Sequence, residues 1–180
     1  METTKQPLIT VVMPNYNGHR FVEQAIDSVL NQTYPNFELL VVDDCSKDNS
    51  LQLIQQKAQS DDRIRVIALE HNAGVANARN VGIKEARGEF IALLDNDDLW
   101  TEDKLARQLA LANKGADIVY CSYDFIDEKN NPIKKPFIVP QQTNFNKMLA
   151  SSVISCSTSF IKTELMQAHP FNSDFYHEDY

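Results

Sequence analysis

The sequence predicts an α/β fold whose central sheet is mostly parallel and is covered by helices on both faces. Short apolar runs alternate with segments in which apolar residues recur at helical spacing, and this alternation occurs four times before residue 115. Successive strand–helix units of this kind form parallel sheets with right-handed crossovers. Polar residues follow each of the first four apolar runs, and ligands bind at that edge of parallel sheets.

The first strand is predicted at residues 8–13, which are apolar, rich in β-branched side chains and followed by Pro14. Residues 20–30 predict a helix, because apolar side chains return every three or four positions. The same two patterns repeat along the next part of the chain. They predict strands and helices in alternation at residues 37–42, 50–58, 64–69 and 75–86.

The fourth strand, residues 90–94, runs directly into Asp95-Asn96-Asp97-Asp98. Three carboxylates within four positions repel one another unless a cation lies between them. Mg²⁺ or Mn²⁺ commonly fills such a place, bound by one or two protein carboxylates and by phosphate oxygens. A surface turn is the alternative interpretation, because Asp and Asn are also favoured in turns. This stretch alone leaves both interpretations open.

The remainder of the chain is less regular. A helix is expected over residues 101–114, a strand over residues 118–125 and a turn at residues 129–132. Further elements are expected near residues 145–151 (helix), 156–161 (strand) and from residue 163 (a short helix). We therefore expect the second half to add a few strands and helices to the sheet that the first half begins.

Composition excludes some classes of function. The chain has 25 acidic and 17 basic residues and a net charge of −8, which opposes binding to nucleic acid. It does not oppose binding a small phosphorylated ligand through a metal. Cys45, Cys121 and Cys156 are odd in number and lack C-x-x-C spacing, so reduced thiols are expected. No signal peptide and no membrane span are evident, so we expect a soluble, cytoplasmic protein, with peripheral contact at the inner face of a membrane left open.

The common phosphate-binding loops are absent. With five glycines, the chain contains neither G-x-G-x-x-G nor a Walker A loop, and it has no G-x-S-x-G elbow. A site that binds a diphosphate without a glycine-rich loop needs a metal, which Asp95 and Asp97 could hold. Tyr16 offers a flat face for a base, and Asp44 offers a carboxylate that could accept a hydrogen bond from a base N–H.

Five short motifs, taken together, are more specific than the D-x-D alone. They are Val12-Met13-Pro14-Asn15-Tyr16-Asn17, Val41-Val42-Asp43-Asp44, Asn77-Ala78-Arg79-Asn80, Leu94-Asp95-Asn96-Asp97-Asp98 and His177-Glu178-Asp179-Tyr180. In their order and spacing the chain resembles, over essentially its whole length, the inverting family-two glycosyltransferases. The resemblance implies the GT-A fold, a Rossmann-like sandwich. It also implies transfer of a sugar, with inversion, from a nucleotide diphosphate donor, usually a UDP-sugar, to an acceptor hydroxyl.

The resemblance implies a role for each residue of the base pocket. Tyr16 would stack on the uracil, and Asp44 would accept a hydrogen bond from its N3–H. Pro14 and Asn15 would shape this pocket, and Arg79 would lie near the base or the diphosphate.

The remaining implied roles concern the diphosphate and the sugar. Asp95 would bind the ribose hydroxyls, with Asn96 beside it in the donor site, and Asp97 would ligate Mg²⁺ or Mn²⁺. The metal would supply charge for the departing diphosphate. Asp179 would be the general base on the acceptor hydroxyl.

Structural roles are the alternative at several of these positions. One of Asp43 and Asp44 is expected to cap the turn that follows them. Arg79 could form an ion pair with Glu85 or Asp95.

The resemblance also bears on domain organisation and on partners. Residues 1–180 are expected to form a single domain, with a nucleotide-binding half at residues 1–100 and the start of an acceptor half at residues 101–180. The chain stops one residue after Asp179, where family members usually continue, so we expect a C-terminal truncation that binds donor but transfers sugar poorly. The implied acceptor is a saccharide or a lipid-linked saccharide of bacterial surface polysaccharide synthesis.

Two other functions compete with this interpretation. A phosphotransferase of the haloacid-dehalogenase kind also uses D-x-D, but after its first strand and followed by Thr or Val. Here the D-x-D follows the fourth strand, and Asp98-Leu99 comes next. The other alternative is a non-catalytic fragment that only binds nucleotide sugars.

Overall fold

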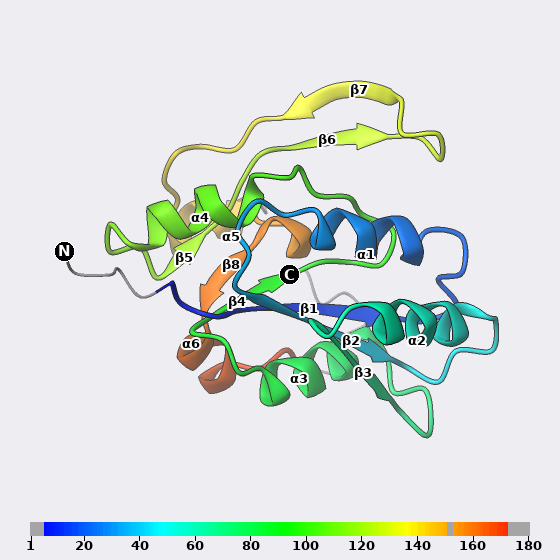
Figure 1. Cartoon of the computed structure of the whole chain (residues 1–180). Coiled ribbons are helices and arrows are strands. Elements are labelled where there is room, and N and C mark those ends of the chain that lie inside the picture. The colour runs from blue at the N-terminus through cyan, green and yellow to red at the C-terminus, as the bar shows by residue number, and fades with distance from the viewer. Residues whose placement is uncertain (1–5, 151–152, 173–180) are drawn as a thin grey trace.

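The computed structural model describes residues 6–150 and 153–172, which are built around a six-stranded sheet in the order β3-β2-β1-β4-β8-β5 (Figure 1). The first four strands run parallel to one another, and β8 runs antiparallel to both β4 and β5. The predicted mostly parallel sheet is therefore confirmed. The strands of this sheet are β1 (Ile9–Asn15), β2 (Phe37–Asp43), β3 (Ile64–Ala68), β4 (Phe90–Leu93), β5 (Ile118–Val119) and β8 (Phe160–Lys162).

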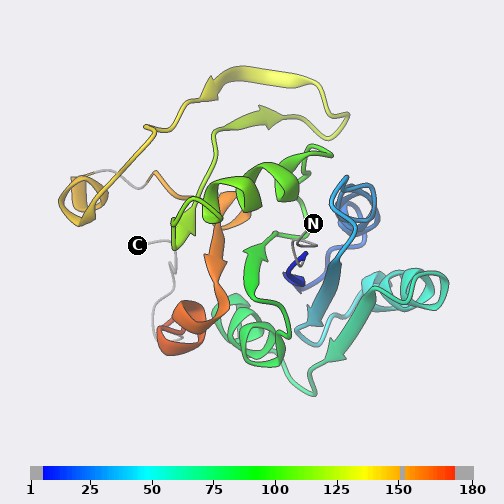
Figure 2. The same ribbon diagram turned by 60° about the vertical axis from the view of Figure 1, so that its left-hand side comes forward.

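Helices cover both faces of the sheet, as expected (Figures 1 and 2). One face packs against α1 (Val22–Leu30), α2 (Ser50–Ser60) and α4 (Lys104–Ala112), and the other against α3 (Val75–Glu85) and α6 (Thr163–Ala168). Two shorter helices, α5 (Phe145–Ala150) and the 3₁₀ helix η1 (Cys156–Thr158), lie between β7 and β8 in the chain.

The central strand β1 shows why the apolar runs are continuous. Every residue of β1 is buried, with Val11 and Met13 in the core on the α1 face and Val12 in the core on the α3 face. A strand buried on both faces has no polar side to present. Helix α3 approaches β1 closely at Gly82, where an added methyl group would contact the side chain of Val12.

The single strand predicted at residues 118–125 is divided into two strands that belong to different sheets. Strand β5 ends at Val119, and β6 (Tyr123–Ile126) pairs instead with β7 (Pro132–Phe137) in a separate two-stranded sheet. Aromatic packing explains the separation, because the rings of Tyr123 and Phe137 stack with their centroids 5.2 Å apart. Strand β7 escaped prediction because it contains two prolines, which strands tolerate only at a sheet edge.

The strand predicted at residues 156–161 is shorter than expected. Its first half is η1, in which hydroxyl groups bond the nearby backbone: Thr158 Oγ1 donates to Ser155 O at 2.7 Å and Ser159 Oγ to Cys156 O at 2.7 Å. Such local bonds compete with a strand ladder. The strand therefore begins only at Phe160, whose ring stacks on that of Phe90 in β4.

Two sequence expectations concern the whole chain. All three cysteines are free thiols, as predicted, and each is partly exposed rather than mostly buried. Within residues 6–150 and 153–172, no helix has both the length and the apolar character that crossing a membrane requires.

Candidate functional site

A pocket of about 410 Å³ opens at the carboxyl ends of β1, β2 and β4. Parallel register brings these ends together, because Asn15 is level with Asp43 and Val12 is level with Leu93. All eight residues that the sequence assigned to donor or metal binding line this pocket: Pro14, Asn15, Tyr16, Asp44, Arg79, Asp95, Asn96 and Asp97. The ninth predicted site residue, Asp179, lies outside the described residues.

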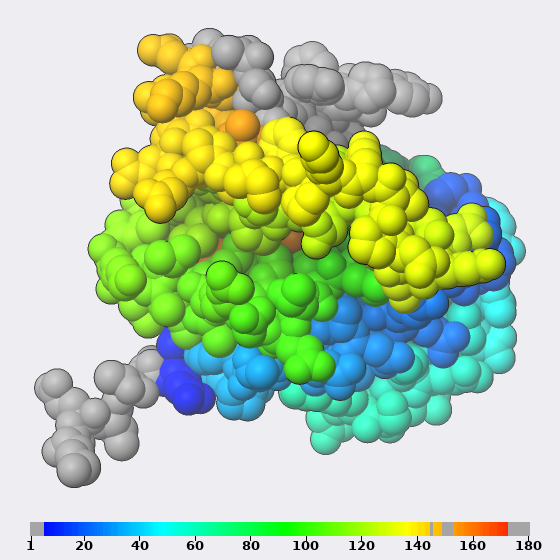
Figure 3. All heavy atoms as spheres, turned by 90° about the horizontal axis from the view of Figure 1, so that it is seen from above, coloured from blue at the N-terminus to red at the C-terminus, as the bar shows by residue number. Residues whose placement is uncertain are grey.

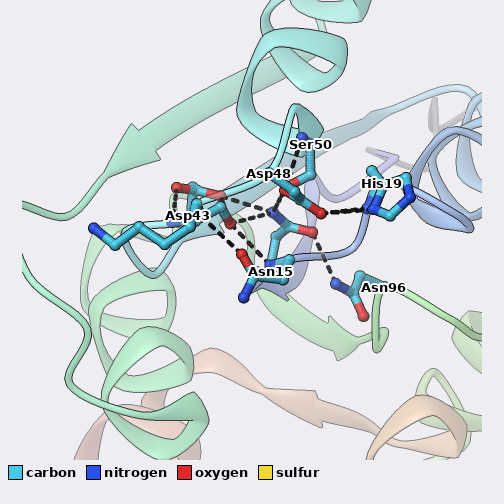
Figure 4. A network of polar contacts seen from close by, with 9 residues as sticks. Asn15, His19, Asp43, Asp48, Ser50 and Asn96 are labelled. Carbon is cyan, nitrogen blue, oxygen red and sulfur yellow. Dashed lines mark hydrogen bonds and ion pairs between the residues drawn. The ribbon is translucent and has the colours of Figure 1, made fainter.

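Asn15 joins the two sides of the pocket (Figure 4). Its side-chain amide donates to Asp43 Oδ1 at 2.7 Å and to Ser50 Oγ at 3.0 Å, and its Oδ1 accepts from the amide of Asn96 at 2.8 Å. The side chain is buried and its amide faces protein partners. Asn15 therefore shapes the pocket by tying the loop after β2 to the loop after β4.

Asp43, the last residue of β2, and Asp44, which follows it, have different hydrogen-bond partners. Asp43 is fully buried and accepts from the backbone N–H and the hydroxyl of Ser46, so it caps the turn, as expected for one of the pair. The carboxylate of Asp44 is fixed at the beginning of α3, where its two oxygens accept from the backbone N–H groups of Ala73 and Gly74 at 2.9 and 2.8 Å. Each oxygen retains a second lone pair with which to accept from a ligand.

Tyr16 stands at the mouth of the pocket with 48% of its surface exposed. It follows directly on β1, and the next residue, Asn17, has a φ of 52°, so the chain turns sharply there. An exposed aromatic ring beside a polar pocket is suited to stacking on a flat ligand.

Arg79 pairs with Asp95, one of the two structural partners expected for it. The distance from Arg79 Nη2 to Asp95 Oδ1 is 2.7 Å, and the arginine side chain is 4% exposed. The guanidinium also lies over the ring of Phe171, with its central carbon 5.4 Å from the centroid. The pair holds the first aspartate of the D-x-D against α3, while Asp97 is exposed at the pocket.

The carboxylates of the pocket suit a metal ion that is bound partly by the protein and partly by a substrate. Among the described residues, no group of three or more His, Cys, Asp or Glu side chains is arranged to hold a metal by itself. Asp95 is engaged by Arg79, which leaves Asp97 as the exposed carboxylate of the motif that lines the pocket. One protein carboxylate completed by phosphate oxygens is a common arrangement for Mg²⁺. The donor set therefore fits a metal that binds together with a diphosphate.

Ser157 is a supporting residue that sequence reasoning missed. Its hydroxyl accepts from the backbone N–H of Asp95 at 3.0 Å, and its carbonyl accepts from the indole N–H of Trp100 at 2.9 Å. Removal from water and the negative charges of Asp95 and Asp97 raise the pKa of Asp98, and a hydrogen bond with Ser157 opposes that rise. Ser157 comes 62 positions after Asp95 and belongs to no motif, so no sequence signal pointed to it.

A substitution at Gly18 tests the junction between the two loops, which is the hydrogen bond between Asn15 and Asn96. A methyl group there would contact the side-chain amide nitrogen of Asn96 and Oδ1 of Asn15. We expect Gly18→Ala to separate these two groups, with a loss of about 0.5–1.5 kcal/mol of stability, the usual worth of one hydrogen bond. Denaturant unfolding measures this loss. An unchanged free energy of unfolding would mean that the junction does not support the pocket.

Similar sequences come from bacterial glycosyltransferases. The chain is 40% identical over 175 residues to the UDP-Glc:alpha-D-GlcNAc-diphosphoundecaprenol beta-1,3-glucosyltransferase WfgD of Escherichia coli, covering 96% of this chain and 67% of WfgD. It is 35% identical over 163 residues to TuaG of Bacillus subtilis (strain 168), a glycosyltransferase assigned to teichuronic acid biosynthesis, covering 90% of this chain and 65% of TuaG. The chain thus spans about two thirds of the length of these relatives.

Similar structures lead to the same family. The crystal structure of residues 1–349 of TarS from S. aureus superposes with a TM-score of 0.75 at 27% identity, covering 95% of this chain and 52% of that one. Its complex with UDP-GlcNAc superposes with a TM-score of 0.74, also at 27% identity, covering 91% of this chain and 48% of that one. The fold is that of the GT-A glycosyltransferases. The family described as Glycosyl transferase family 2 matches residues 10–168. The chain belongs to glycosyl transferase family 2.

Proposed function

We propose that this chain binds a UDP-sugar and takes part in transferring the sugar, with inversion, to an acceptor hydroxyl. One observation carries the proposal: the eight residues assigned to the donor and its metal, which are scattered from Pro14 to Asp97 in the sequence, line a single pocket. Two similar proteins support the donor class, since WfgD is named for UDP-Glc and TarS was crystallised with UDP-GlcNAc.

The base of the nucleotide is held between an aromatic ring and a carboxylate. Tyr16 stacks on the uracil from the exposed mouth of the pocket, and Asp44 accepts from the uracil N3–H. Because Asp44 is fixed by two backbone amides, it needs no rearrangement to accept this bond. Asp95, oriented by Arg79, binds the ribose hydroxyls, with Asn96 beside it.

Asp97 would hold Mg²⁺ or Mn²⁺ beside the diphosphate, and the metal would supply positive charge for the departing diphosphate. In a direct displacement, Asp179 takes the proton of the acceptor hydroxyl, the acceptor oxygen bonds to the anomeric carbon, and the bond from that carbon to the diphosphate breaks. Attack from the opposite side of the leaving group inverts the configuration.

The acceptor and the cellular place follow from the relatives' names. WfgD acts on a sugar carried by diphosphoundecaprenol, and TuaG is assigned to teichuronic acid, so we propose a saccharide or lipid-linked saccharide acceptor and a part in surface polysaccharide synthesis. We further propose that the transfer takes place in the cytoplasm, at the inner face of the membrane. Residues 1–100 form the nucleotide-binding half of one domain, and residues 101–180 begin its acceptor half.

A panel of nucleotides tests the function. We expect UDP-sugars to bind more tightly with Mn²⁺ than without it, and more tightly than GDP- or ADP-sugars, in isothermal titration calorimetry. A radiolabelled UDP-sugar incubated with a lipid-linked saccharide then tests transfer. Donor binding without transfer would leave a donor-binding fragment, and phosphate release from a phosphomonoester would favour a phosphotransferase.

Asp44 should carry the preference for uridine. A hydrogen bond between a charged acceptor and the base N3–H contributes about 1.5–3 kcal/mol, so Asp44→Ala should weaken UDP binding by about 10- to 100-fold. Binding of GDP should change little, because stacking on Tyr16 tolerates any base. Calorimetry with both nucleotides measures the change in preference, and thermal unfolding shows whether the pocket survives the loss of the Ala73 and Gly74 contacts. If wild-type protein binds GDP as tightly as UDP, Asp44 does not read the base.

A further inference from the structure

A series of side-chain hydrogen bonds runs from the loop after β2 to the D-x-D motif (Figure 4). It begins at Asp48, passes through the hydroxyl of Ser50 to the amide of Asn15, and ends at Asn96. The last of these bonds, from Asn96 Nδ2 to Asn15 Oδ1, is 2.8 Å long. The two asparagines line the pocket, whereas Asp48 and Ser50 do not. The series therefore connects residues outside the pocket to residues of its wall.

Asp48 determines the direction of the Ser50 hydroxyl. The carboxylate accepts from the backbone N–H of Ser50 at 2.9 Å and from its hydroxyl, and also from the backbone N–H and ring Nδ1 of His19 at 3.1 and 2.9 Å. Although burial raises the pKa of Asp48, these hydrogen bonds lower it to about 2, so the side chain is ionised at neutral pH. An ionised carboxylate cannot donate. Ser50 therefore gives its proton to Asp48, and its oxygen accepts from Asn15 at 3.0 Å.

The acceptors beside Asn15 fix which way its amide points. The amide nitrogen donates to Asp43 Oδ1 at 2.7 Å and to Ser50 Oγ at 3.0 Å, with a longer contact of 3.2 Å to Ser46 Oγ. A reversed amide would place its oxygen against the Asp43 carboxylate with no proton between them. Asn15 is 1% exposed, so water could not relieve that contact cheaply. Asn15 therefore presents its oxygen, and not its nitrogen, to Asn96.

Asn96 is oriented in turn by Asn15. Because Asn15 offers an oxygen, Asn96 turns its NH₂ group toward it, and Figure 4 shows the carbonyl oxygen of Asn96 on the side away from Asn15. Within residues 6–150 and 153–172, no group donates a hydrogen bond to that oxygen. Asn96 is partly exposed in the pocket lining, next to Asp97. Its oxygen is therefore available to a ligand in the pocket.

The loop between β1 and α1 supports this arrangement. The side chains of the two asparagines fill the space that a Cβ at Gly18 would need. The next residue, His19, is bonded to Asp48. Arg20 then forms an ion pair with Glu128 at 2.6 Å. Figure 3 shows the atoms of the β6–β7 hairpin (yellow) beside those of this loop and α1 (blue), the two parts that the ion pair joins. The loop is thus fixed immediately after the point where it meets the asparagines.

We infer that Asn15 is a positioning residue for the donor, because it holds the side-chain oxygen of Asn96 toward the ligand in the pocket. An amide oxygen accepts hydrogen bonds and binds hard cations, but it repels the oxygens of a diphosphate. The ligand atom that meets Asn96 is therefore electropositive: a hydroxyl hydrogen of the UDP-sugar, or the metal ion that Asp97 would hold. The inference rests on the proposed binding of a UDP-sugar in this pocket.

A double-mutant cycle tests the inference, with the binding of UDP-glucose measured by isothermal titration calorimetry. Asn96→Ala removes the oxygen and should weaken binding about tenfold. Asn15→Ala leaves the oxygen but releases it, and should weaken binding about three- to tenfold. The double variant N15A/N96A should bind no more weakly than Asn96→Ala, because Asn15 acts through Asn96. Losses that multiply in the double variant would overturn the inference.

Two further substitutions separate positioning from a general loss of stability. Ser50→Ala removes an acceptor of Asn15 from outside the pocket and should weaken binding about two- to fivefold, and Ser50→Thr, which keeps a hydroxyl, should restore it. Thr10→Ala is the matched control, because Thr10 is also fully buried, at the opposite end of β1, where its hydroxyl bonds to Glu38 at 2.7 Å. It should lower the melting temperature and bind UDP-glucose as the wild type does. A loss of affinity in Thr10→Ala as large as that in Ser50→Ala would assign Ser50 to stability alone and overturn the inference.

The same titrations with and without Mn²⁺ identify the ligand atom. A loss in Asn96→Ala that occurs only with Mn²⁺ assigns the oxygen to the metal, and an equal loss under both conditions assigns it to a hydroxyl. Unchanged or tighter binding by Asn96→Ala would overturn the inference and leave the proposed function in place. If the wild type does not bind UDP-glucose under either condition, the proposed function fails, and the inference fails with it.

Discussion

Replacing Asp97 by alanine should remove the metal-stimulated part of UDP binding and leave the fold intact. Asp97 is exposed at the pocket, so its loss creates no cavity and breaks no buried contact. Asp95 cannot substitute easily, because its carboxylate is paired with Arg79 at 2.7 Å. We expect Mn²⁺ to strengthen UDP binding to the wild type. In the presence of Mn²⁺, Asp97→Ala should bind UDP about ten- to hundredfold more weakly than the wild type does.

The same experiment has a matched control in the chain. Asp62 is also an exposed aspartate, between α2 and β3 and away from the pocket lining, so Asp62→Ala should respond to Mn²⁺ as the wild type does. Addition of EDTA to the wild type should reproduce the Asp97→Ala result without any mutation. If Mn²⁺ strengthens UDP binding equally in Asp97→Ala and the wild type, another group holds the metal.

The sequence predicted which residues line the pocket because its signals are local and repeated. Strands buried on both faces appear as unbroken apolar runs, as in β1 and β2, and each is followed at once by the polar residues of the site. Parallel pairing then brings those residues together, whatever the conformations of the loops between the strands. The convergence of Pro14, Asp44 and Asp97 in one pocket thus follows from the order of the strands.

The parts that sequence reasoning missed depend on contacts between distant segments. Ser157 supports Asp95 from 62 positions away and comes from a 3₁₀ turn that resembled a strand. The β6–β7 pair was hidden because Pro132 and Pro136 argue against a strand unless the edge position of that strand is known. The role of Asn15 was only partly visible, since a polar residue at the end of a strand could face a ligand or, as here, bind four other side chains.

The described part of the chain ends beside the pocket, which bears on the base predicted at Asp179. The side chain of Asn80 in α3 holds the backbone of Phe171 with two hydrogen bonds of 2.8 and 2.9 Å, and the ring of Phe171 lies under Arg79. Arg79 in turn binds Asp95 of the site. Asp179 comes eight residues after Phe171, and eight residues can span up to about 26 Å when extended. Because Phe171 lies against Arg79 of the pocket lining, a connection of this length allows Asp179 to approach the pocket.

Asp179→Asn should lower the rate of sugar transfer by about 10²- to 10⁴-fold, the usual contribution of a general base. Asparagine keeps the size of the side chain but cannot take the proton of the acceptor hydroxyl, so UDP-sugar binding should be unchanged while turnover falls. The measurement is transfer from a radiolabelled UDP-sugar in a chain extended to the length of WfgD, with Glu178→Gln as the neighbouring control. A base on the acceptor must lie opposite the leaving diphosphate, so Asp179 and Asp97 act on different sides of the sugar. Asp97→Ala should therefore weaken UDP-sugar binding, whereas Asp179→Asn should slow proton removal. The double variant should show both effects. Full activity in Asp179→Asn would remove Asp179 as the base and direct attention to the other carboxylates around the pocket.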